Sequence, residues 1–292
     1  MIVVMALMSV ASGTMAQSRQ DKYIKSHVGV GLRGGIGRML TLPTSETTVG
    51  MTLGVDAEYT YLLSEHFGVK AGIGVSHTRS SFDMDELISE PTKLTTVTTS
   101  GGEEQIMAKY RCVTINAVER YAMTYVDIPV MVMIQGTPMD FTIKRFHSCY
   151  FAVGAKVGLP LSCTANTEYS TTKVYVGPSI PGSGVVLDEM LQVENYEPER
   201  QSYNISDAGN PLYVMLALEG GVTLKLNDAG ELLFALYGDY AINHSTTNNP
   251  VDASAIASNG DQFTTNGYLK SNNVDRFKFF RVGLKVQYNF HW

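Results

Sequence analysis

The residue types that most often carry catalysis are scattered through this sequence. The six histidines occupy positions 27, 66, 77, 147, 244 and 291, without the spacing of metal ligands. No Gly-x-Ser-x-Gly, His-Glu-x-x-His, P-loop or Cys-x-x-Cys motif is present. One cluster, His77 with Ser76, Ser80 and Ser81, could imitate a hydrolase site, but we favour an ordinary polar strand end as its explanation. We therefore expect no enzyme activity, no metal site and no cofactor.

Acidic residues gather in one polar stretch, where carboxylates could hold a divalent cation. They are Asp83, Asp85, Glu86, Glu90, Glu103 and Glu104. Such a group more often marks a solvated loop.

A second set of charged residues has a more specific spacing, because each member alternates with apolar neighbours. The bases are Arg33, Lys70, Lys156, Lys225, Arg281 and Lys285, and the acids are Asp56, Glu58, Asp127, Glu219 and Asp239. Six bases against five acids nearly cancel. The chemistry that this pattern offers is mutual neutralisation, provided that the chain brings the charges together.

The final stretch shows which elements carry these charges. From Phe280 to Trp292, every second residue is apolar or aromatic, and Arg281, Gly283 and Lys285 lie between them. Alternation of this kind predicts a strand with one apolar face. The stretch is long enough for the about 9–11 residues with which a tilted strand crosses a bilayer. The last strand of a soluble β-sandwich is the alternative.

The aromatic C-terminus favours the membrane interpretation. Tyr288, Phe290 and Trp292 alternate up to the last residue. This pattern resembles the signal by which the barrel-assembly machinery recognises outer-membrane proteins.

Seven further segments alternate in the same way, so eight strands are predicted. They cover residues 27–40, 49–63, 67–76, 120–134, 149–163, 213–226, 232–243 and the final stretch. Tight turns at 64–66 and 227–230 alternate with long polar loops at 80–119, 164–212 and 244–274. Short turns on one side and long loops on the other are typical of a bacterial outer-membrane barrel. The prediction is an all-β, eight-stranded, antiparallel up-and-down barrel with periplasmic turns and extracellular loops.

The two faces of these strands can be assigned in two ways. Apolar faces turned inward would give a soluble, lipocalin-like barrel. Apolar faces turned outward would contact lipid and leave the charged set in the lumen. Charges inside so narrow a barrel must pair, because an unpaired buried charge costs several kcal/mol. We therefore predict an occluded, charge-paired lumen.

Aromatic residues near the predicted strand ends agree with the outward assignment. Those expected at the periplasmic rim are Tyr59, Tyr61, Phe67, Phe151, Phe290 and Trp292. Phe280, Tyr240 and Tyr121 would serve the opposite rim. Outer-membrane barrels carry aromatic girdles at both interfaces.

The N-terminus and composition point to export. Residues 1–16 are apolar and end in small residues, which predicts a secretory signal peptide before a single barrel domain of residues 17–292. A buried helix is the alternative. A net charge of −6 argues against nucleic acid as a partner. The three cysteines give no complete disulfide framework; only Cys112 and Cys163 could pair, and structural thiols are expected.

Two segments resemble a known family. They are YVDIPV at residues 125–130 and YFAVGAKVGLP at residues 150–160. Both are similar to the outer-membrane β-barrel domain family that includes the PorT-like proteins. The resemblance implies the barrel fold and a location in the bacterial outer membrane, and says little about activity because the family is functionally mixed.

Two functional classes follow. The first is a structural or surface-interaction barrel, with outer-membrane lipid, lipopolysaccharide, and a surface or host protein as partners through its loops. The second is a narrow channel or transporter for small solutes. The charge balance and the strand number favour the first.

Overall fold

A computed structural model describes most of the chain as strand. The described residues are 26–43, 49–89, 92–99, 102–136, 146–169, 172–176, 191–196, 201–205, 211–227, 230–243, 245–246, 256–259, 262–265, 267–269 and 274–291. Within them, no helix has the length and apolarity needed to cross a membrane. The predicted signal peptide and Trp292 lie outside these ranges.

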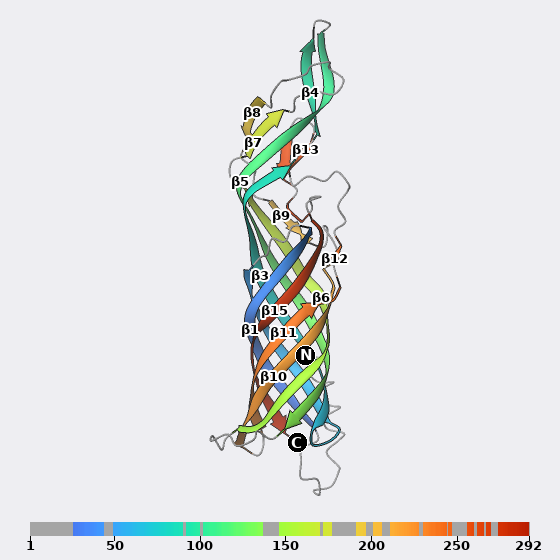
Figure 1. Cartoon of the computed structure of the whole chain (residues 1–292), viewed down its shortest axis with the longest axis vertical. Coiled ribbons are helices and arrows are strands. Elements are labelled where there is room, and N and C mark those ends of the chain that lie inside the picture. The colour runs from blue at the N-terminus through green and yellow to red at the C-terminus, as the bar shows by residue number, and fades with distance from the viewer. Residues whose placement is uncertain are drawn as a thin grey trace.

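Eight long antiparallel strands close into a barrel (Figure 1). They are β1 (Ser26–Pro43), β2 (Val49–Leu62), β3 (Phe67–Ser89), β5 (Gly102–Gly136), β6 (Phe146–Tyr169), β10 (Tyr213–Asn227), β11 (Gly230–Ala241) and β15 (Val274–His291). Around the ring the order is β5, β3, β2, β1, β15, β11, β10 and β6, and β6 pairs with β5 to close it. The predicted eight-stranded up-and-down barrel is confirmed.

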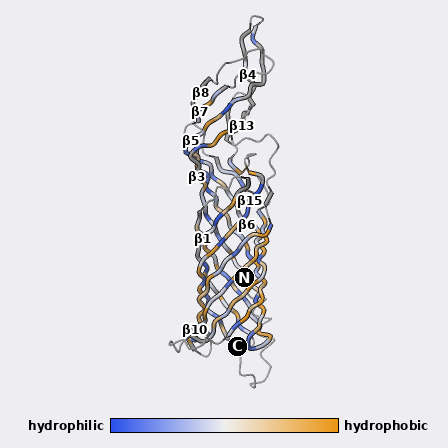
Figure 2. The backbone as a smooth tube through the Cα atoms, viewed as in Figure 1, coloured by the Kyte–Doolittle hydropathy of each residue, from blue (hydrophilic) through white to orange (hydrophobic). Residues whose placement is uncertain are grey.

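The apolar positions of these strands face outward. Leu53, Leu236 and Leu284 expose 59%, 65% and 63% of their surface, fractions that a soluble core would not leave open. The alternating residues, such as Asp56, Asp239 and Lys285, are buried. Figure 2 shows the resulting alternation of hydrophobic and hydrophilic residues along the barrel strands. An apolar outer wall of this kind requires a lipid environment.

The tight connection between β2 and β3 forms as the sequence predicts. The backbone N–H of Leu63 donates to the carbonyl of Phe67 at 2.8 Å. The hydroxyl of Ser64 accepts hydrogen bonds from the backbone N–H groups of His66 and Phe67 at 3.3 and 3.1 Å. A side-chain acceptor therefore satisfies the donors that the reversal leaves open.

The expected loop at 80–119 is largely strand, which corrects the sequence interpretation. β3 continues to Ser89 and β5 begins at Gly102, and the two remain paired well beyond the apolar wall. Asn116 has a φ of 53°, in the left-handed region, and pairing skips this residue. Because of this irregularity, the positions that point inward differ before and after Asn116. The alternation of apolar and polar residues therefore changes phase, and the segment shows no clear period in the sequence.

Short strands lie in all three of the expected long loops. The short strands are β4 (Thr92–Thr99), β7 (Thr172–Val176), β8 (Leu191–Tyr196), β9 (Gln201–Asn204), β12 (Ser245–Thr246), β13 (Ile256–Asn259) and β14 (Gln262–Thr265). β4 and β7 pair with β5, and β9 pairs with β6. In Figure 1 the labels of β4, β7 and β8 lie beyond one end of the barrel.

Pro129 lies inside β5, where a missing backbone N–H would weaken a central strand. Its pairing with Lys156 of β6 is kept, but the pairing of β5 with β3 breaks between Asp127 and Val130. The proline therefore interrupts the pairing of β5 with β3 locally and does not end the strand.

The barrel interior has an apolar cluster at each end. The smaller one, near the short turns, contains Leu62, Met131, Met133 and Leu233. The larger one contains the aromatic residues Phe82, Tyr121, Tyr125, Tyr213, Tyr268, Phe277 and Phe279, which we call the aromatic cluster. Tyr121 is only 1% exposed, so it packs inside and does not belong to the outer girdle. The charged residues lie between these clusters.

Candidate functional site: the charged interior of the barrel

Every barrel strand contributes at least one buried charged side chain to the interior. Ten of them contact one another, and going around the ring they are Asp127 of β5, Lys70 of β3, Asp56 and Glu58 of β2, Arg33 of β1, Arg281 and Lys285 of β15, Asp239 of β11, Glu219 of β10 and Lys156 of β6. They number five bases and five acids. The period-2 geometry of the strands places all of them on the inner face.

Six of these residues form a group around Asp127. Arg33 contacts Asp56 at 2.7 Å and Asp127 at 3.0 Å. Arg281 contacts Asp127 at 3.3 Å and Asp239 at 3.4 Å. Lys156 donates to both carboxylate oxygens of Asp239 at 2.7 Å. Three cations and three carboxylates are therefore in direct contact, and we call them the Asp127 group.

The other four residues form the Glu219 group. Lys285 contacts Glu58 at 2.5 Å and Glu219 at 3.2 Å. Lys70 contacts Glu58 at 2.9 Å and also pairs with Glu219, which accepts a further hydrogen bond from the hydroxyl of Tyr150. Two cations face two carboxylates, so this group is also balanced.

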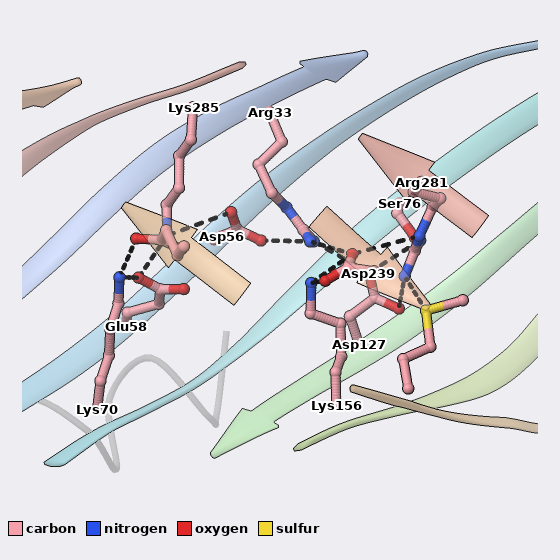
Figure 3. A network of polar contacts seen from close by, with 12 residues as sticks. Arg33, Asp56, Glu58, Lys70, Ser76, Asp127, Lys156, Asp239, Arg281 and Lys285 are labelled. Carbon is pink, nitrogen blue, oxygen red and sulfur yellow. Dashed lines mark hydrogen bonds and ion pairs between the residues drawn. The ribbon is translucent and has the colours of Figure 1, made fainter. Parts of the chain in front are cut away.

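The two groups lie side by side and are joined by one longer contact (Figure 3). The Nζ atom of Lys285 lies 3.9 Å from a carboxylate oxygen of Asp56. Side chains of all these residues are at most 6% exposed. The local charge sum is therefore zero in each group, which is the condition under which buried ions are tolerated.

Several of these ion pairs cross the bore instead of joining neighbouring strands. Arg281 of β15 and Asp127 of β5 lie on opposite sides of the ring. Arg33 of β1 reaches the same Asp127, and Lys70 of β3 reaches Glu219 of β10. Side chains from opposing walls therefore meet near the middle of the barrel.

Glycines on the inner face make room for these long side chains. A Cβ atom added at Gly74 would lie 2.4 Å from a carboxylate oxygen of Asp56. At Gly158 an added Cβ would lie 2.0 Å from the ring of Tyr213. Any larger residue would displace the charge or the aromatic ring beside it.

The aromatic cluster covers the Asp127 group on the side away from the short turns. The guanidinium of Arg281 lies 5.0 Å from the ring centroid of Tyr213, whose hydroxyl donates to Asp127. The ring of Tyr213 lies 4.5 Å from Tyr125 and 5.6 Å from Phe279, centroid to centroid. The Asp127 group and the aromatic cluster are therefore in direct contact inside the barrel.

Ten of the eleven charged residues selected from the sequence meet in this site. The exception is Lys225, which is exposed near the end of β10. Alternation places it on the inner side, but at the lip of the barrel the inner side opens to water.

Tyr150 and Tyr213 are site residues that sequence reasoning did not select. Ser76, which the sequence suggested only for the hydrolase cluster, accepts a hydrogen bond from Arg281 at 2.8 Å and also belongs to the site. These residues alternate with outward apolar residues in the sequence, and this pattern could have assigned them to the interior.

A separate buried carboxylate, Glu119, lies within the aromatic cluster. It accepts hydrogen bonds from the hydroxyls of Tyr121, at 2.8 Å, and Tyr203, and from the backbone N–H of Tyr268 at 2.5 Å. Burial raises the pKa of the Glu119 carboxyl, and these hydrogen bonds oppose the shift. Glu119 therefore ties β9 and the segment after β14 to the extended part of β5.

The candidate hydrolase cluster is not assembled. Ser76 and Ser80 are buried on the inner face of β3, whereas His77 faces outward, where its Nδ1 lies 2.9 Å from the hydroxyl of Thr124. Ser76 and Ser80 therefore cannot meet His77. Ser81 shares the outward face of His77 but lies four residues along the strand, about 13 Å away at about 3.3 Å per residue.

The structure also describes the candidate metal ligands and the cysteines. Among the residues that the structure describes, no group of three histidine, cysteine or acidic residues could hold a metal ion. Asp83 and Glu86 are exposed. Cys112, Cys149 and Cys163 form no disulfide with one another.

Comparison with known proteins identifies the family. The model of the outer membrane protein β-barrel domain matches residues 15–247. The chain belongs to this family. The protein is accordingly located in the bacterial outer membrane, with short periplasmic turns and long extracellular segments.

Solved outer-membrane structures are similar to this family member at low identity. The attachment invasion locus protein Ail of Yersinia pestis, solved with the heparin analogue sucrose octasulfate, is 11% identical, with a TM-score of 0.30 over 90% of this chain and 99% of that one. OprG of Pseudomonas aeruginosa is 10% identical, with a TM-score of 0.31 over 92% and 97%. Neisserial surface protein A is 8% identical, with a TM-score of 0.28 over 89% and 95%. No curated protein sequence matches the chain.

Proposed function

We propose that this protein is a non-enzymatic outer-membrane barrel whose lumen is closed, and that it acts through its extracellular segments as a structural or surface-interaction protein. The observation that carries the proposal is the set of ion pairs that cross the bore. Arg281 to Asp127 and Lys70 to Glu219 join strands that are not neighbours. An open pore would instead leave the charges of each wall facing water.

Three features support closure. Each charge group is balanced, so no residue in it needs a solute ion for compensation. The aromatic cluster lies over the Asp127 group and joins it through the contact of Arg281 with Tyr213. Eight strands also give an interior that side chains can fill.

The extracellular part supports a role in contacts outside the membrane. β3 and β5 extend far past the apolar wall, and β4 and β7 pair with this extension. Glu119 fixes two further segments to it. A preformed extracellular surface of this kind offers a rigid platform for a partner such as a host or neighbouring-cell protein.

Conductance in planar lipid bilayers tests closure against the channel alternative. We expect the purified, refolded protein to give no steady conductance. The double variant Lys70→Ala/Lys285→Ala, which removes both cations of the Glu219 group, should leak more than the wild-type protein. A steady, large conductance of the wild-type protein would refute closure and support the channel.

A further inference from the structure

A group of cations lies on the outer wall where the apolar surface of β1 and β15 ends. Along β15 the outward residues change from the exposed Leu284 and Val282 to Phe280, Lys278 and Arg276. Along β1 they change from Ile36 to Arg38. The cations therefore lie directly on the extracellular side of the lipid-facing wall.

The strand register brings these cations close together. Arg38 is opposite Phe280, Leu40 is opposite Lys278, and Leu42 is opposite Arg276. Outward residues two positions apart on paired antiparallel strands lie within reach of long side chains. We call Arg38, Lys278 and Arg276 the basic seam.

Aromatic side chains fix the depth of the basic seam in the membrane. The Nζ atom of Lys278 lies 5.3 Å from the ring centroid of Tyr240 and 3.4 Å from its hydroxyl. Tyr240 is itself opposite Phe280 in the pairing of β11 with β15. Aromatic residues in these positions mark the level of the lipid headgroups. The ammonium group is therefore held at headgroup level.

The two ends of the apolar wall differ in chemistry. At the periplasmic end, outward residues of the described strands include the aromatic Tyr61, Phe67, Phe151 and Phe290. At the extracellular end of β1 and β15, the described outward charges are the three cations of the basic seam. The cations therefore distinguish the extracellular end, where they would face the anionic groups of the outer leaflet.

We propose that the basic seam binds the phosphate groups of the outer-leaflet glycolipid, the lipid A portion of lipopolysaccharide. The acyl chains would lie along the apolar wall below, beside Ile36, Val282 and Leu284. Guanidinium and ammonium groups form charge-assisted hydrogen bonds to phosphate oxygens. The proposal is independent of whether the lumen conducts.

Binding of lipid A with and without its phosphates tests the proposal. The refolded protein in detergent is titrated with bisphosphorylated lipid A, with the same lipid after removal of its phosphates, and with inorganic phosphate. Because each cation near an anionic lipid surface contributes a several-fold gain in binding, we expect a preference of at least roughly tenfold for the phosphorylated lipid. The triple variant Arg38→Gln/Arg276→Gln/Lys278→Gln should lose that preference.

A matched control is available on β5. Arg120 is also an exposed extracellular cation, but it pairs with Glu168 at 2.5 Å. Arg120→Gln removes one positive charge and should keep the preference. If the triple variant does not refold, Arg276→Gln alone, at the exposed end of the seam, should lower binding of phosphorylated lipid A by roughly fivefold.

Three outcomes would overturn the proposal. The first is equal binding of both lipids by the wild-type protein. The second is an unchanged preference in the refolded triple variant or in Arg276→Gln. The third is competition by inorganic phosphate at concentrations comparable to those of lipid A, which would indicate a site for free anions.

Discussion

Arg281 has more kinds of partner than any other cation of the Asp127 group. Its guanidinium contacts Asp127 and Asp239, donates to Ser76, and lies over the ring of Tyr213. Removing it leaves two buried carboxylates with one cation fewer, and an uncompensated buried charge is costly.

We therefore expect Arg281→Ala to lower the free energy of unfolding by about 3–5 kcal/mol. Urea unfolding in lipid vesicles, monitored as the loss of the folded band on a gel, measures this free energy of unfolding. Lys225→Ala is the matched control, since Lys225 is an exposed cation at the lip of the barrel. Equal stability of the two variants would show that the Asp127 group does not hold the barrel together.

Glu119 is the residue whose protonation should affect the extracellular part of the fold. Burial raises the pKa of its carboxyl above the ordinary value of 4.5, so the folded state binds the proton more tightly than the unfolded state does. Stability from this proton is fully present below pH 4.5 and is lost as the pH rises through the folded-state pKa.

The expected result is a wild-type unfolding free energy that decreases as the pH rises above 4.5, through the folded-state pKa. Glu119→Gln carries no titrating carboxyl and should remove that part of the pH dependence. Urea unfolding of both proteins at a series of pH values provides the measurement. Parallel pH profiles for the two proteins would contradict the prediction.

At the scale of the strand, the outward band determines how firmly the barrel is held in lipid. Leu236 lies midway along the outward residues of β11 and exposes 65% of its surface. Leu236→Arg should cost about 2–4 kcal/mol of stability in vesicles, because the guanidinium would have to enter the hydrocarbon.

Leu63 provides the control for this substitution. It is equally exposed, at 65%, but lies in the turn between β2 and β3, outside the apolar wall. Leu63→Arg should therefore change the unfolding free energy in vesicles much less than Leu236→Arg. Similar losses for both would mean that Leu236 does not face lipid.

At the scale of the whole molecule, closure of the ring depends on β15. This strand pairs with β1 on one side and β11 on the other, and it carries Arg281 and Lys285. Its last aromatic residues, Phe290 and Trp292, are the expected assembly signal, and Phe290 is exposed on the outer wall.

Deleting residues 290–292 should leave exported but unassembled protein in the periplasm. Cell fractionation followed by a test for the heat-resistant folded band distinguishes assembled from unassembled protein. As a control, Phe67→Ala removes an exposed rim aromatic elsewhere in the barrel and should leave assembly intact. Normal outer-membrane levels of the truncated protein would contradict an assembly signal at the C-terminus.

The sequence alone determined the barrel and the inward position of its charges. Alternation along a strand has a fixed period of two. The inner face could therefore be assigned without coordinates to Asp127, between Val126 and Ile128, and to Lys285, between Leu284 and Val286. Loop lengths then distinguished the two ends. Lys225 was misplaced because periodicity gives the face of a residue but not its depth.

The tertiary structure decided which charges meet and where the barrel ends. Arg281 and Asp127 are in contact only because β15 and β5 lie on opposite sides of one closed ring. No local sequence pattern encodes this relation. The extension of β3 and β5 was hidden for a different reason. At Asn116 the inward–outward alternation of β5 changes phase, and beyond the lipid the core side becomes aromatic and the outer side polar. Surroundings, rather than sequence periodicity, determine which face is apolar there.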